Sequence, residues 1–133
     1  LEEAIHAFSS ALRDKVRATY PLPEAETITY EEVTDKPWSG FNYYLGDYKS
    51  TVAVNADLKQ QMSNLPRLVA HESYPGHHTE HCRREAGLVA RDGHAEQTIF
   101  LVNTPQCLMA EGLADLALYD LHRHALHRFG DLS

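Results

Sequence analysis

The chain has 133 residues, a formal net charge of −7 at pH 7 and nine histidines. A chain of this length can bury one hydrophobic core, so we expect a single domain over residues 1–133. The acidic balance argues against nucleic acid or an anionic membrane as a partner, because both attract clustered lysine and arginine, and no apolar run approaches the roughly 20 residues that span a bilayer.

The N-terminal half is predicted to contain one helix and two strands. Apolar residues recur every three or four positions from residue 1 to about residue 19, which predicts an amphipathic helix that Pro21 and Pro23 end. Residues 26–34 are rich in β-branched and aromatic side chains and predict a strand. Residues 50–55 form the clearest strand pattern of the chain.

Two features of this half are predicted to be structural. The aromatic stretch from Trp38 to Tyr48 is interrupted by Gly40 and Gly46 and favours core and turn packing over a ligand-binding cage. The acidic residues between Glu24 and Asp35 are expected on a solvated strand face.

From Leu65 onward the pattern is helical, with breaks at Pro75-Gly76, near Gly87 and Gly93, and at Thr104-Pro105. The predicted fold class is therefore α+β, with a mainly helical core and a small N-terminal sheet. The chain starts at Leu1, directly in helical periodicity, so we expect it to be part of a longer protein.

The chemistry concentrates in residues 71–78, which read His-Glu-Ser-Tyr-Pro-Gly-His-His. A histidine followed by glutamate and a further histidine is similar to the zincin signature H-E-x-x-H, whose histidines bind zinc and whose glutamate is the general base. On a straight helix His78 would lie about 10.5 Å along the axis from His71, too far for two ligands of one zinc ion. We therefore predict a helix break at Pro75-Gly76 that brings His71 close to His77 or His78.

A third ligand and its support are expected from the last helix. Glu111 lies in the second turn of a helix that starts at Pro105, and Asp115 follows four residues later on the same face. Asp115 could accept the free ring N–H of a ligating histidine. We expect Gly112 to let this helix approach its neighbour closely.

Three other patterns have alternative interpretations. His81 and Cys82 could extend the histidine cluster into a closed structural metal site. Cys82 and Cys107 could form a disulfide, although small buried thiols are the favoured interpretation. The histidines at 122, 124 and 127 favour a solvated helix end, where cations complement the helix dipole.

The segments HESYPGHH at 71–78 and AEGLA at 110–114 resemble the bacterial domain of unknown function 885 family, whose members are regarded as zincin-related metallopeptidases. The resemblance covers about residues 41–120 and implies a zincin-like core with one Zn²⁺. It implies His71, His77 and Glu111 as ligands and Glu72 as the general base, with His78 as the rival of His77.

Two departures from the family pattern carry expectations. Leu113 stands where the family usually has tryptophan, which would reshape the pocket wall. Family members have several hundred residues, so we expect another chain or a remaining domain to complete the cleft.

The function implied is hydrolysis of peptide bonds by zinc-activated water, with Glu72 as the base. The candidate donors to the oxyanion are Tyr74, Tyr119 and His122. A peptide substrate is expected to pair with an edge strand formed by Val52, Ala53, Val54 and Asn55. The alternative is a truncated, catalytically inactive member that keeps the metal site and serves as a metal-binding or interaction module.

Overall fold

The chain forms a small three-stranded sheet with helices against it, which confirms the predicted α+β class. The computed structural model describes residues 1–57 and 63–130 and, within the last helix, side chains as far as residue 123. In chain order the elements are α1 (Glu2–Thr19), β1 (Thr27–Val33), β2 (Gly40–Gly46), β3 (Lys49–Asn55), α2 (Leu65–Glu72), α3 (His77–Arg84), the π-helical segment η1 (Glu85–Arg91), the 3-10 turn η2 (Ala95–Thr98) and α4 (Pro105–Gly130).

The N-terminal helix forms where the apolar spacing predicts it. α1 buries Ile5, Leu12 and Val16 in the core, because residues three and four positions apart share one face of a helix. The helix ends at Thr19, and the backbone of Tyr20 is already extended directly before Pro21.

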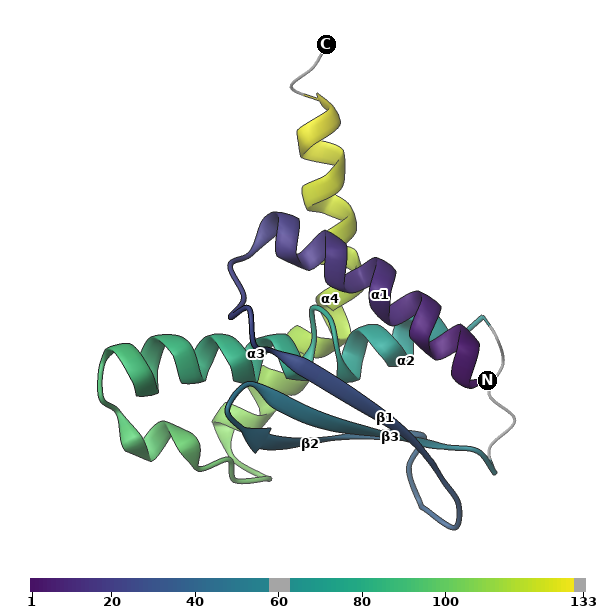
Figure 1. Cartoon of the computed structure of the whole chain (residues 1–133), viewed down its shortest axis with the longest axis horizontal. Coiled ribbons are helices and arrows are strands. Elements are labelled where there is room, and N and C mark those ends of the chain that lie inside the picture. Colours follow the sequence, from purple (N-terminus) through teal and green to yellow (C-terminus); the bar gives the residue numbers. More distant parts are fainter. Residues whose placement is uncertain (58–62, 131–133) are drawn as a thin grey trace.

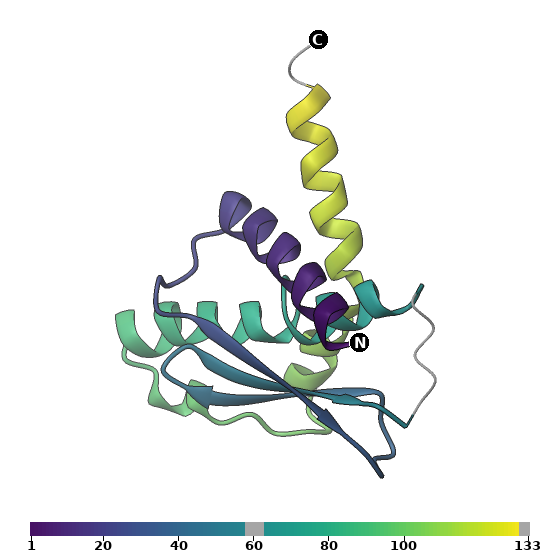
Figure 2. The same ribbon diagram turned by 45° about the vertical axis from the view of Figure 1, so that its right-hand side comes forward.

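The sheet has the strand order β1-β3-β2, with β1 parallel and β2 antiparallel to β3. In Figures 1 and 2, α1, α2 and α3 lie on one side of this sheet, and the C-terminal end of α4 stands clear of the other elements. Val52 and Val54 of β3 face these helices and join the core. Phe41 and Tyr43 of β2 point to the opposite face, because they pair with Ala53 and Thr51.

The prediction that residues 52–55 form a sheet edge is wrong. β3 lies between the other two strands, and Val52, Ala53, Val54 and Asn55 are all buried. Val52 and Val54 are covered by the helices, and Ala53, on the other face, is a small residue with Glu31 and Phe41 as its neighbours on the two flanking strands. The edges of the described sheet are β1 and β2.

The aromatic stretch contains an edge strand, which sequence analysis did not predict. β2 occupies Gly40–Gly46 and returns into β3 through a tight turn in which Asp47 and Tyr48 have φ values of 52° and 62°. This strand lies beside α2 and α3, the helices that carry the candidate residues His71, Glu72 and His77.

The expectation of a solvated acidic stretch is wrong for Glu26. Its side chain is fully buried, although Glu24 nearby is exposed. Arg13 Nε and Arg17 Nη2 donate to Glu26 Oε1 at 2.6 and 2.7 Å. Burial alone raises the pKa of a carboxyl group, but hydrogen bonds from His78, Tyr74, Arg17 and Arg13 outweigh it and hold the pKa of Glu26 well below its usual range.

Three further findings concern cysteines, membrane spans and exposed apolar surface. Cys82 and Cys107 are both free, so the disulfide alternative is wrong. Within the described residues, no helix combines the length and apolar character needed to cross a bilayer.

Large apolar side chains are exposed on α4 and on the segment before it, at Ile99, Leu101, Val102, Leu108, Met109, Leu113, Leu116 and Tyr119.

Candidate metal centre

The predicted helix break at Pro75-Gly76 is confirmed, and it depends on a glycine. α2 ends at Glu72 and α3 begins at His77, with Gly76 N–H donating to the Ala70 carbonyl at 2.9 Å. A Cβ atom on Gly76 would lie 1.9 Å from the His71 carbonyl oxygen, which no side chain can tolerate. The close approach of the two helix ends at Gly76 therefore places His77 beside His71.

The break brings together two histidines and one glutamate. Ligand atoms of His71, His77 and Glu111 all lie within 4.8 Å of one another, so these three residues could hold a metal ion. They are called the metal group below. His71 Nε2 lies 3.2 Å from Glu111 Oε2, and His77 Nε2 lies 3.2 Å from Glu111 Oε1. The two imidazole rings are nearly perpendicular, with centroids 4.8 Å apart.

The chemistry and spacing of this group are compatible with zinc. Two imidazoles and one carboxylate are a ligand set of catalytic zinc sites. Bonds of about 2.0–2.2 Å place neighbouring ligands of a tetrahedral zinc about 3.3–3.6 Å apart. The two histidine–glutamate distances of 3.2 Å are close to this range. Burial lowers the pKa of His77 and thereby favours the neutral imidazole that ligates metal.

Asp115 lies where the spacing predicts it, behind His71. Asp115 Oδ1 is 3.1 Å from His71 Nδ1, the ring nitrogen that faces away from Glu111. The same carboxylate oxygen lies 3.5 Å from Arg67 Nη2. Asp115 can therefore accept the Nδ1–H of His71 and leave Nε2 unprotonated for a metal ion.

His77 and His78 are alternative candidates for the second histidine ligand, and they lie in different environments. His78 is completely buried. His78 Nε2 donates to Glu26 Oε2 at 2.8 Å, and its Nδ1 is hydrogen-bonded to Ser50 Oγ at 2.7 Å. Because both ring nitrogens are engaged in the core, His78 belongs to the Glu26 network and His77 to the metal group.

Glu72 lies beside the metal group with its side chain largely buried. Its Cγ atom lies 3.4 Å from where a Cβ would be on Gly40, so α2 packs closely on the start of β2. Burial raises the pKa of the Glu72 carboxyl to about 7; His71 and a backbone hydrogen bond with Asn42 oppose the rise, and Glu111 adds to it. A carboxyl group whose pKa lies near 7 can both accept and return a proton at physiological pH.

The metal group and Glu72 open into a cavity of about 610 Å³ between β2, α2, α3 and the segment before α4. Several residues that sequence reasoning did not select line it, notably Asn42, Tyr44, His81 and Phe100. Asn42 donates from Nδ2 to the Glu72 carbonyl at 2.9 Å, whereas its buried Oδ1 has no hydrogen-bond partner among the described residues. The aromatic residues Phe41, Tyr43 and Tyr44, of a type enriched in strands, were the signal that could have indicated a strand there.

The predicted oxyanion donors do not reach this cavity. Tyr74 is buried in the core and donates to Glu26 Oε2 at 2.5 Å. Tyr119 and His122 lie on α4 about 12 and 16.5 Å along the helix axis from Glu111, by a rise of about 1.5 Å per residue. Both are exposed, and neither lines the cavity.

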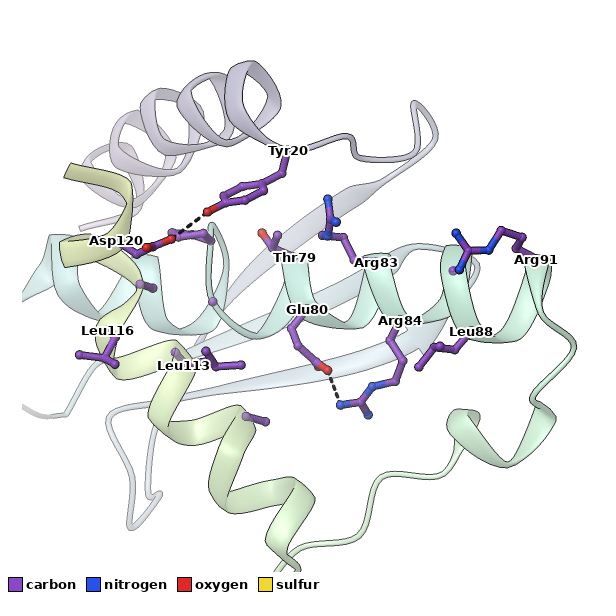
Figure 3. A pocket seen from close by; sticks show the side chains of 16 residues that line it. Tyr20, Thr79, Glu80, Arg83, Arg84, Leu88, Arg91, Leu113, Leu116 and Asp120 are labelled. Carbon is purple, nitrogen blue, oxygen red and sulfur yellow. Dashed lines mark hydrogen bonds and ion pairs between the residues drawn. The ribbon is translucent and has the colours of Figure 1, made fainter. Parts of the chain in front are cut away.

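A second hollow, of about 640 Å³, lies on the other side of α4 between this helix, α3 and η1 (Figure 3). Leu113 points into this hollow and does not line the metal-facing cavity, so the expectation that it reshapes that pocket wall is wrong. Gly112 does not mark a close helix contact, because a Cβ added there would meet no atom of the described part of the chain within 4 Å.

The remaining histidines and cysteines form no second cluster within the described residues. Cys82 Sγ lies 3.5 Å from His78 Nε2, but that nitrogen already donates to Glu26. His122 is exposed at a helix position, as a solvated helix end predicts. His124 and His127 lie outside the described side chains.

Comparison with protein-family models, curated proteins and solved structures found no match to this chain.

Proposed function

We propose that this protein is a zinc-dependent hydrolase with a zincin-like core that cuts peptide bonds. The observation that carries the proposal is the convergence of His71, His77 and Glu111, with Glu72 beside them, on one cavity. The resemblance of the 71–78 and 110–114 segments to the domain of unknown function 885 family supports the same reaction class.

Each residue of the group has a distinct role in the proposed reaction. His71, His77 and Glu111 would hold the ion, and Asp115 would fix the orientation and tautomer of His71. A bound zinc ion supplies a Lewis acid that activates water and polarises a carbonyl group. Glu72 would accept the proton of the attacking water and return it to the leaving amine.

A peptide substrate is supported by the position of β2. This strand is an edge of the sheet, pairs only with β3 among the described strands, and lines the cavity from Gly40 to Leu45. An extended peptide can add to such an edge through main-chain hydrogen bonds. We therefore propose β2, in place of residues 52–55, as the strand that orients the substrate.

Metal content tests the first part of the proposal. We expect wild-type protein to bind one zinc ion, and His71→Ala, His77→Ala and Glu111→Ala each to lose it, because a three-residue site has no spare ligand. His94→Ala is the matched control, since the His94 side chain is exposed, lies 3.2 Å from Glu96 and does not line the cavity. Elemental analysis measures the zinc content of each protein, and melting curves with and without a chelator measure the effect of zinc on its stability. Wild-type protein without stoichiometric zinc and without a chelator effect would contradict the proposal.

The Glu72→Gln variant tests the second part. The amide keeps the shape of the side chain but cannot accept a proton, so zinc content should remain and turnover should fall by at least about 100-fold. Cleavage of a mixed peptide library, followed by mass spectrometry, measures turnover, with Glu96→Gln as the control. Zinc-loaded wild-type protein that cleaves no peptide would favour the inactive metal-binding module. Loss of zinc in Glu72→Gln would show that Glu72 is a ligand and not the base.

A further inference from the structure

The metal-facing cavity has an aromatic wall formed by Tyr44, His81 and Phe100. The His81 ring stacks on Tyr44, with centroids 4.7 Å apart and an interplanar angle of 11°. It meets Phe100 nearly edge-on, with centroids 5.5 Å apart. These three residues also line an adjoining hollow of about 320 Å³, so the wall extends away from the metal group.

The wall is held in place from three elements. The Tyr44 hydroxyl donates to the Glu85 carboxylate, which also accepts from the backbone N–H of Asp47 at 3.0 Å. On the other side of the cluster, the Arg84 guanidinium lies 5.9 Å from the centre of the Phe100 ring. A surface fixed in this way can bind an apolar group without first paying the entropy of ordering the rings.

The wall lies directly beside the proposed point of cleavage. His81 follows His77 by four residues on α3, so the two side chains leave the same face of the helix one turn apart. A substrate whose reacting carbonyl lies at His71, His77 and Glu111 would therefore place a neighbouring side chain against His81 and its ring partners.

The lining of the cavity favours an apolar side chain over a charged one. Apart from Glu72, the metal group and His81, the described residues that line the cavity carry no titratable group other than tyrosine hydroxyls. Leu45 and Val102 add further apolar lining to this cavity. A charged substrate side chain would lose hydration here. Arg84 and Glu85, which line the adjoining hollow, already bind Glu80 and the Tyr44 hydroxyl.

We infer that Tyr44, His81 and Phe100 form a specificity subsite that takes an apolar, preferably aromatic, side chain of the substrate next to the bond that is cut. This inference rests on the proposed function. It adds a substrate preference that the metal group alone does not determine, because His71, His77 and Glu111 would hold the ion that acts on the reacting carbonyl and would not select the neighbouring side chain.

A pair of zinc-binding ligands separates the subsite from the metal centre. Two peptide hydroxamates that differ only in a benzyl or a methyl side chain next to the chelating group are titrated by calorimetry into zinc-loaded protein. We expect the benzyl compound to bind at least about 10-fold tighter, since a hydrophobic pocket discriminates by this factor or more for a single methylene. Phe100→Ala should reduce the ratio of the benzyl to the methyl affinity to about threefold or less and leave the affinity for the methyl compound unchanged.

Two further variants keep the test decisive. Leu45→Ala removes an exposed side chain at the mouth of the cavity, so it should fold and reduce the ratio in the same direction if Phe100→Ala does not fold. Leu108→Ala is the matched control, because Leu108 is 76% exposed and lies outside the cavity. Equal affinity for both compounds, or a ratio that neither cavity variant changes, would overturn the subsite alone. If zinc-loaded protein bound neither compound, the proposed function would fail together with the subsite.

Discussion

The two ring nitrogens of His71 have different partners, and this difference defines what Asp115 does. Nε2 faces Glu111 and Nδ1 faces Asp115, so replacement of Asp115 should change the metal site without removing a ligand. We expect Asp115→Asn to weaken zinc binding by about 10- to 100-fold, the usual effect of losing a carboxylate behind a ligating histidine. Competition with a chromogenic chelator measures the affinity.

The control for Asp115 is another carboxylate that pairs with a cation away from the cavity. Asp92 binds Arg91 at 2.7 Å and lies in the loop after η1, so Asp92→Asn should leave zinc affinity unchanged. Equal affinities of wild type and Asp115→Asn would mean that Asp115 does not orient His71.

At the scale of single residues, the sequence indicates His71 and Glu111 as candidate metal ligands but does not decide between His77 and His78 as the third. Neighbouring residues at a helix start point about 100° apart, so the backbone angles of the break decide which of them faces the cavity. The partner that holds His78 in the core is Glu26, which is 52 residues away in the chain. No local pattern reveals that contact or the one from Tyr74, so the sequence does not indicate that Glu26 is buried.

The junction between α2 and α3 is the element on which the metal group depends. Any side chain at Gly76 would collide with the His71 and Ala70 carbonyl oxygens, at 1.9 and 2.4 Å from its Cβ. We expect Gly76→Ala to destabilise the fold by at least about 2 kcal/mol and to weaken zinc binding, because backbone must move between the two histidines. Urea unfolding and the chelator competition measure the two effects.

Gly112 provides the matched control for this junction. It lies inside α4 next to Glu111, and a Cβ there would meet none of the atoms that the structure describes within 4 Å. Gly112→Ala should therefore keep the zinc affinity and stabilise the protein by about 0.5–1 kcal/mol through helix propensity. A Gly76→Ala variant as stable and as tight for zinc as Gly112→Ala would contradict the role given to the junction.

The elements themselves were predictable to different degrees for physical reasons. Helices such as α1 depend on contacts three and four residues apart, so their periodicity is visible in the sequence. Strand position in a sheet depends on pairing between distant segments, so residues 52–55 could be recognised as a strand but not as the central one. β2 was missed because glycines at both of its ends and adjacent aromatic residues resemble a turn.

At the scale of the whole molecule, one buried carboxylate connects the layers that surround the candidate site. Glu26 precedes β1 and binds Arg13 and Arg17 of α1. On its other oxygen it accepts from Tyr74, in the linker between α2 and α3, and from His78 of α3. His78 follows His77 directly, so the network that anchors the core also fixes the start of the helix that carries a proposed metal ligand.

This network predicts how stability depends on pH. The folded-state pKa of Glu26 lies below the value of about 4.3 expected for an unfolded glutamate, so the ionised side chain stabilises the fold fully above about pH 5. That contribution is lost as the pH falls through about 4 and below, because only the unfolded state then takes up the proton. We expect the free energy of unfolding, measured by urea at pH 6, 5, 4 and 3.5, to fall steeply below pH 5.

Glu26→Gln should remove that steep step and lower stability at pH 6 by about 3 kcal/mol, since loss of one member of a buried ionic network leaves the others unpaired. The loss should stay at the lower end for buried pairs because the Arg13 side chain is 41% exposed and can regain water. Glu24→Gln, two residues away on an exposed side chain, is the control and should unfold like the wild type at every pH. If Glu26→Gln and wild type lost stability in parallel between pH 6 and 3.5, the acid sensitivity would come from other carboxylates, and Glu26 would not be the residue that holds the layers together.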